Sequence, residues 1–101
     1  MGSPTTARAA AHTGAHASAH TPERTPELTP QQIAERVRDG MFANDRASKM
    51  LGMRIVEVGP GRAVLEMTVV EAMLNGHDIC HGGLIATLAD STFAFACNSR
   101  N

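Results

Sequence analysis

Residues 75–99 read NGHDICHGGLIATLADSTFAFACNS, and this stretch decides the fold. It joins a polar turn, Asn75-Gly76, and a diglycine, Gly82-Gly83, to a run that holds one charged side chain, Asp90. Apart from Asp90, residues 82–98 are apolar, small or neutral, which predicts a helix surrounded by protein on most sides. Burying an ionised carboxylate without a partner is unfavourable, so the pattern predicts either a partner or a chemical role for Asp90.

The segment before this helix predicts a β-hairpin. Residues 53–70 are rich in Val and Ile, with the turn sequence Gly59-Pro60-Gly61 in the middle. A two-stranded hairpin alone is marginal in water, so we expect the apolar helix to cover it. The buried face of the second arm is predicted at Ala63, Leu65, Met67 and Val69.

An amphipathic helix is predicted to begin after Thr29. Pro30 takes the first helical position, and Gln32 lies three residues past Thr29, as in a capping box. The apolar face of this helix consists of Ile33, Val37 and Met41.

The first quarter of the chain is predicted to be a disordered extension. Between Gly2 and Glu27 there is no Val, Ile, Leu, Met or Phe, so little apolar surface offsets the entropy of ordering. We therefore expect residues 1–28 to be disordered and residues 29–101 to form the N-terminal part of one domain.

The histidines and cysteines do not predict a metal site. The histidines at 12–20 recur every four residues, but Gly, Ser and Thr-Pro pairs around them oppose the helix that would gather them. Cys80 beside His81 offers two ligands at most. Cys80 and Cys97 flank and end the apolar helix, too far apart to bond within one chain. We expect reduced thiols and no cofactor.

Charge and hydropathy argue against two classes of partner. The formal net charge of −1, from 9 basic and 10 acidic residues, provides no electrostatic footprint for nucleic acid or an anionic membrane. The N-terminus lacks the apolar core of a secretory signal, and the helix at 82–98 is short for a membrane span and carries Asp90. We expect a cytoplasmic protein without nucleic-acid or membrane partners.

The order of hairpin, polar loop, diglycine and apolar helix with a central Asp resembles the hotdog-fold acyl-CoA thioesterases. Within them it is similar to the phenylacetate-degradation thioesterase group of the 4-hydroxybenzoyl-CoA thioesterase superfamily. The resemblance runs from about residue 43 to 101 and is strongest in MLNGHDICHGGLIATLADSTFAFACNS, residues 73–99. It implies an α+β hotdog fold, an antiparallel sheet wrapped around one long helix. The family pattern continues with further strands, so we expect this chain to lack the C-terminal ones.

The resemblance also implies a hydrolase that cleaves acyl-CoA thioesters, including phenylacetyl-type CoA, with active sites between joined subunits. Thioester hydrolysis needs a nucleophile and donors for the developing oxyanion. Gly82 and Gly83 begin a helix, where free N–H groups and the positive end of the dipole coincide. We expect the Gly82 N–H to be the oxyanion donor and Gly83 to contribute to substrate binding. The alternative is that both glycines only permit tight packing of the helix start.

Asp90 is predicted to act as general base for water or as a nucleophile that forms a mixed anhydride, and the sequence leaves both open. It lies eight residues past Gly82, about 12 Å along a helix, too far to act on a carbonyl held at its own helix start. We therefore expect a homodimer or homotetramer in which Asp90 of one subunit faces Gly82 of another. The alternative is a buried Asp90 that caps a neighbouring backbone group.

The motif assigns further roles by resemblance. His81 would position the thioester or cap the helix, and Asn75 would hold water or the acyl carbonyl. Thr92, two residues past Asp90, would bind water or substrate, with packing as the alternative. Two other functions stay open: an acyl-thioester hydratase or dehydratase of the same fold, and an inactive fragment or assembly module.

Overall fold

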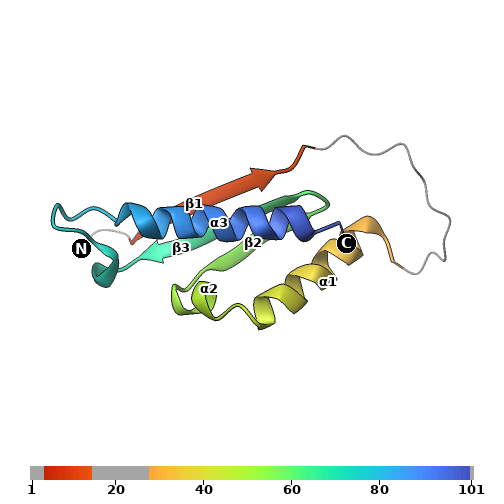
Figure 1. Cartoon of the computed structure of the whole chain (residues 1–101), viewed down its shortest axis with the longest axis horizontal. Coiled ribbons are helices and arrows are strands. Elements are labelled where there is room, and N and C mark those ends of the chain that lie inside the picture. Colours follow the sequence, from red (N-terminus) through yellow and green to blue (C-terminus); the bar gives the residue numbers. More distant parts are fainter. Residues whose placement is uncertain (1–3, 15–27, 101) are drawn as a thin grey trace.

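The computed structural model describes residues 4–14 and 28–100. Its elements are β1 (Thr5–His12), α1 (Pro30–Ala43), α2 (Arg46–Met50), β2 (Arg54–Gly59), β3 (Arg62–Val69), the 3₁₀ turn η1 (Glu71–Met73) and α3 (Gly82–Asn98). The described strands form one antiparallel sheet in the order β1-β3-β2. Figure 1 shows α3 lying lengthwise over this sheet.

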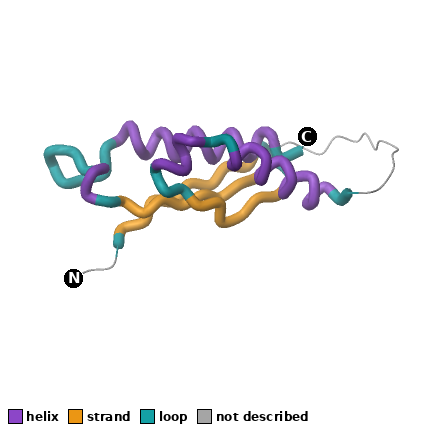
Figure 2. The backbone as a smooth tube through the Cα atoms, turned by 90° about the horizontal axis from the view of Figure 1, so that it is seen from below, coloured by secondary structure: helices purple, strands orange, loops and turns teal. Residues whose placement is uncertain are grey.

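The helices lie on one face of the sheet, as Figure 2 shows. α3 packs over β1 and β3, whereas α1 packs over β2. The predicted α+β class, with an apolar helix against an antiparallel sheet, is confirmed. The core between the two layers consists of Ala34, Met53, Val58, Ala63, Leu65, Met67, Met73, Leu88, Phe95 and Ala96.

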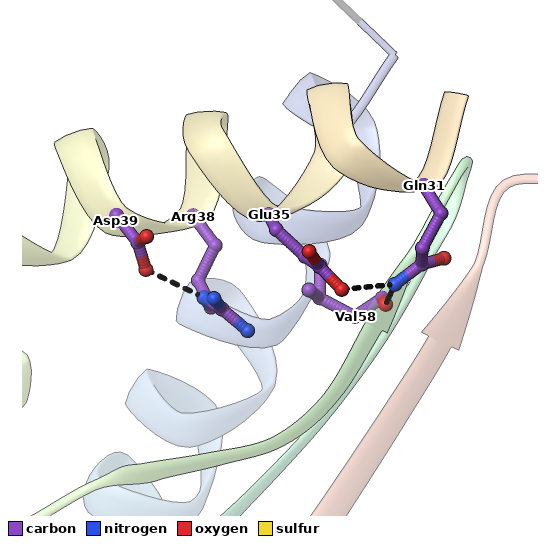
Figure 3. Close-up of polar contacts among 5 residues, drawn as sticks. All are labelled: Gln31, Glu35, Arg38, Asp39 and Val58. Atoms are coloured by element: carbon purple, nitrogen blue, oxygen red, sulfur yellow. Dashed lines mark hydrogen bonds and ion pairs between the residues drawn. The ribbon is translucent and has the colours of Figure 1, made fainter. Parts of the chain in front are cut away.

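The predicted capping box at the start of α1 is confirmed. The Thr29 hydroxyl accepts a hydrogen bond from the Gln32 N–H at 3.1 Å, and the Gln32 side-chain oxygen accepts one from the Thr29 N–H at 2.8 Å. The first turn of α1 also contacts the sheet, as Figure 3 shows. There the Gln31 amide donates to the Val58 carbonyl of β2 at 2.8 Å and to Glu35 at 3.1 Å, so α1 is fixed to the edge strand.

The predicted hairpin is also confirmed, and its turn is tied to the end of α3. Gly61 has φ +76°, a backbone conformation that residues other than glycine rarely adopt. Its N–H donates to the Ser99 hydroxyl at 2.7 Å, and that hydroxyl donates to the Ala96 carbonyl at 2.8 Å. Ser99 is fully buried, so this bridge holds the last turn of α3 over the hairpin.

The prediction of disorder for residues 1–28 is wrong for Thr5–His12, which form β1. β1 pairs with β3 from Thr5 opposite Val69 to His12 opposite Arg62. The composition argument considered the apolar surface of the segment alone. The edge of β3 supplies partners for its backbone groups, and the alanines at 7, 9 and 11 fit beneath α3. Residues 15–27, with His16 and His20, lie outside the described residues.

α3 is covered on one side only. Leu88, Thr92 and Phe95 face the sheet and are buried, whereas Ile85 is 42% exposed and Phe93 is 58% exposed. The prediction of a helix surrounded on most sides is therefore wrong for the single chain. An apolar sequence pattern shows that a helix surface is hydrophobic, but it does not show which part of the protein covers that surface. Within residues 4–14 and 28–100, each helix, α3 included, falls short of what a membrane crossing requires.

Candidate active site

The face of α3 that points away from the sheet brings the two main predicted site residues together. We call it the α3 outer face and define it by Gly82, Ala86, Asp90, Phe93 and Cys97, all of them exposed. At 3.6 residues per turn, these positions fall within about 80° around the helix axis. Asp90 carries the only charge in α3, so an otherwise uncharged surface presents one carboxylate.

Asp90 is exposed in the single chain, so the prediction that this carboxylate is buried is wrong at that level. The alternative of a buried Asp90 that caps a backbone group is wrong for the same reason. No described residue forms an ion pair with it. Its carboxylate is therefore free to act on a group brought to the outer face from elsewhere.

Gly82 leaves open space at the start of α3. A Cβ built on Gly82 would meet no atom within 4 Å, so no described residue packs closely there and the packing alternative gains no support. The Gly82 N–H has no backbone acceptor among the described residues. This N–H group lies at the positive end of the α3 dipole, on an exposed residue.

His81 is the N-cap of α3. Its Nδ1 accepts a hydrogen bond from the Gly83 N–H at 3.0 Å, and its carbonyl accepts from the Leu84 N–H at 2.9 Å. A neutral imidazole that accepts at Nδ1 carries its proton on Nε2. The capping role is thus the one that the structure displays, and it occupies the Gly83 N–H while the Gly82 N–H stays open.

Asn75 shapes the loop before α3. Its side-chain oxygen accepts hydrogen bonds from the N–H groups of His77 at 2.8 Å and Ile79 at 3.2 Å. Asp78, between them, has φ +61°. The loop is thereby closed on itself, and the His81 N–H ties its end to the Met73 carbonyl at 2.8 Å. The Asn75 amide nitrogen keeps its donors for other partners.

Thr92 does not join the other predicted site residues. Its side chain is 1% exposed, and its hydroxyl donates to the Leu88 carbonyl at 2.7 Å. Two residues along a helix correspond to about 200°, so Thr92 lies on the opposite side of α3 from Asp90. The packing alternative describes its position.

The sequence did not predict a series of hydrogen bonds that links Asp45, Ser48 and Ser91, the residue next to Asp90. The Ser48 hydroxyl donates to the Asp45 carboxylate at 2.6 Å, and it lies 2.8 Å from the Ser91 hydroxyl. A serine has one hydroxyl proton, so Ser91 must donate to Ser48. Ser48 is 1% exposed, and these hydrogen bonds link α2 to the residue that follows Asp90. The signal available in the sequence was Asp45 three residues before Ser48, a helix N-cap spacing.

Two other features of the described chain stay apart from these residues. An open hollow of ≈ 340 Å³ lies beside α1 and is lined by Arg38, Asp39, Phe42, Ala43 and Ile55. Cys80 and Cys97 are free thiols. In the part of the chain that the structure describes, no group of three His, Cys, Asp or Glu side chains comes together as a metal site would require.

Comparison with known proteins places the chain beside thioesterases. No protein-family model matches it. The acyl-coenzyme A thioesterase PaaI of Escherichia coli (strain K12) is 52% identical over 60 residues, which cover 59% of this chain and 43% of that protein. A putative esterase of Archaeoglobus fulgidus is 47% identical over 68 residues, 67% of this chain and 44% of the relative. Human acyl-coenzyme A thioesterase 13 is 42% identical over 55 residues, 52% and 39% of the two chains.

The structure of the E. coli PaaI protein from the phenylacetic acid degradation operon matches with a TM-score of 0.70 and 44% identity. The resemblance to hotdog-fold acyl-CoA thioesterases is confirmed. The match covers 71% of this chain and 52% of the PaaI chain. The chain spans less than half the length of these curated relatives.

Proposed function

We propose that this protein is an acyl-CoA thioesterase that hydrolyses aryl-acyl thioesters of the phenylacetyl type to the free acid and CoA. The observation that carries the proposal is the α3 outer face, where one carboxylate, Asp90, and one open N–H, that of Gly82, share an exposed apolar surface. The names of the relatives support the thioesterase class. Both cysteines are free, which suits a reducing compartment, and we propose a cytoplasmic location.

The proposed reaction uses each group at a defined atom. A water oxygen attacks the thioester carbonyl carbon while Asp90 takes a water proton, or Asp90 attacks directly and water then cleaves the mixed anhydride. The Gly82 N–H donates to the oxygen that becomes negative in the transition state. The C–S bond breaks, and the CoA thiolate leaves and takes up a proton.

The proposed site is shared between two copies of the chain. Asp90 and Gly82 of one helix lie about 12 Å apart along the axis, so one thioester cannot contact both. In an antiparallel α3 pair related by a two-fold axis, residue numbers opposite each other have a constant sum. If Asp90 faces Gly82, Ala86 faces itself on the axis. Ala86 is small and exposed, which lets two helices approach closely there.

The remaining motif residues act around the Gly82 N–H in this proposal. His81 holds the first turn of α3 through its Nδ1. In this proposal its Nε2 donates a hydrogen bond to the thioester. Gly83 lets the His81 ring lie close, since a Cβ at Gly83 would be 3.3 Å from Nδ1. Asn75 offers its amide nitrogen to water or to the acyl carbonyl. Thr92 supports the helix from its packed side.

The test combines an activity assay with subunit mixing. Release of phenylacetate and CoA from phenylacetyl-CoA is followed by liquid chromatography, with an aliphatic acyl-CoA and an enoyl-CoA assayed beside it. We expect thioester hydrolysis that Asp90→Asn abolishes without loss of folding. Hydration of enoyl-CoA in place of hydrolysis would assign the protein to the hydratases instead.

Mixing then tests the shared site. Asp90→Asn and Gly82→Pro subunits are each inactive alone in this proposal. In a mixed dimer one site carries both changes and the other carries neither. An equal mixture should therefore recover about one quarter of wild-type activity, because half of the dimers are mixed and half of their sites are intact. Absence of recovery in dimers verified as mixed contradicts the shared site.

A further inference from the structure

β1 is held by backbone pairing with β3 and by the packing of a few small side chains. It pairs with β3 along its whole length, and its main contacts with the rest of the described chain are to β3 and α3. Its inward residues, at 7, 9 and 11, are alanines that are only partly buried. The Arg8 guanidinium lies 3.7 Å from the Glu66 carboxylate in a partly exposed ion pair. No side chain of β1 belongs to the buried core.

The edge of β3 beside β1 needs to be covered more than β1 needs to be buried. Leu65 and Met67 of β3 are fully buried, and the N–H and C=O groups on that edge of β3 require a pairing strand. Half of the β1 sequence TTARAAAH is alanine, which is depleted in strands. Release of β1 therefore breaks few side-chain contacts but leaves an edge that another strand must cover.

A second copy of the chain presents this edge in the same register. Every contact that β1 makes with β3 and α3 can form between copies, so exchange conserves the pairing and the Arg8–Glu66 ion pair. Residues 13–29 connect β1 to α1, and a chain of that length spans up to about 60 Å when extended. β1 can therefore reach β3 of a neighbouring copy.

We propose that β1 is an exchangeable edge strand, which pairs with β3 of its own chain or with β3 of a second copy in a strand-exchanged dimer. The occupant of the β3 edge is in both cases the segment Thr5–His12. Because own-chain pairing is favoured by proximity, the exchanged dimer grows with protein concentration. The proposal stands independently of the thioesterase chemistry.

Paired cysteines test this exchange. Thr6 and Thr68 are directly opposite in the register, and such pairs have Cα separations of about 4.5–5.5 Å, within the range of a disulfide. Full-length Thr6→Cys and Thr68→Cys chains, each also carrying Cys80→Ser and Cys97→Ser, are mixed in a glutathione redox buffer at several concentrations. The mismatched control mixes His12→Cys with Thr68→Cys. His12 faces Arg62, about 20 Å along the strand from the position opposite Thr68.

The expected result is an interchain disulfide in the Thr6→Cys and Thr68→Cys mixture, about tenfold above the mismatched control and rising with concentration. The double variant Thr6→Cys/Thr68→Cys on one chain decides the negative case. If it forms an intrachain bond while the mixture matches the control, β1 pairs only with its own chain and the proposal is wrong. If neither bond forms, β1 does not occupy the β3 edge in solution, which also overturns it.

Discussion

Replacing Gly82 by proline removes one N–H group and almost nothing else. Gly82 is the first residue of α3, the position where proline is favoured because that N–H has no helical partner. The residue before a proline must be extended, and His81 already has φ −58° and ψ 131°. The ring also has space, since a Cβ at Gly82 meets nothing within 4 Å. We expect Gly82→Pro to fold with unchanged or slightly raised stability.

The effect on catalysis should be large by contrast. Loss of one oxyanion donor typically lowers kcat about 100- to 1000-fold, or roughly 2.7–4 kcal/mol of transition-state stabilisation. Gly82→Ala is the matched control, because it adds a carbon at the same position and keeps the N–H. The ratio of kcat between the two variants therefore isolates the hydrogen bond from any steric effect of the added carbon. Phenylacetyl-CoA hydrolysis measures the ratio, and circular dichroism with thermal unfolding checks the fold.

Two results would refute this reasoning. If Gly82→Pro retains kcat within a few-fold of Gly82→Ala, the Gly82 N–H does not stabilise the oxyanion. If Gly82→Ala falls as far as Gly82→Pro while both fold, the open space over Gly82 matters and the N–H does not. A loss of helix content in Gly82→Pro alone would show that the start of α3 differs from the first-turn geometry described above.

The other predictions concern the α3 outer face and the hydrogen bonds among Asp45, Ser48 and Ser91. Ala86→Cys, in a background without the natural cysteines, should form a symmetric disulfide dimer, and a purely monomeric product under oxidation contradicts the two-fold pairing at Ala86. Phe93→Ala should raise the dimer dissociation constant about 30-fold or more, since one exposed Phe is lost from each subunit, while Val56→Ala, on β2, should leave sedimentation unchanged. Ser48→Ala should lower the free energy of unfolding by roughly 1.5–3 kcal/mol because a buried donor to a carboxylate is lost, and Ser91→Ala by less. Equal losses in urea unfolding would contradict the order of these hydrogen bonds.

The elements that local chemistry specifies could be predicted from the sequence. The capping box at Thr29 and the turn at Gly61 each depend on residues within a few positions, and both formed as expected. The helix at 82–98 followed from its apolar run, and its predicted start and end agree with α3. β1 could not be predicted in this way, because its backbone partners lie fifty or more residues away on β3. Alanine carries no strand signal of its own.

The candidate site also has some features that local sequence predicts and others that depend on the folded structure. The diglycine and Asp90 are visible as a motif, and their common face follows from helical spacing. The Gly83 N–H donates to His81 Nδ1. This hydrogen bond depends on the rotamer of His81, which cannot be read from the sequence. The contact of Ser48 with Ser91 joins residues forty-three apart and needs the packed positions of α2 and α3. Thr92 shows the converse error, because proximity to Asp90 in sequence placed it on the wrong side of the helix.

The exposed state of Asp90 is itself an argument about assembly. A lone carboxylate on the surface of a single chain is well solvated, and water competes with any substrate for it. Phe93 and Ile85 on the same helix are large and more than two-fifths exposed, so contact with a second α3 would remove apolar surface from water. That contact would desolvate Asp90 at the moment it brings the partner's Gly82 N–H near. In the proposed function, association and activation of the carboxylate are therefore one event, and dilution should lower the activity per subunit.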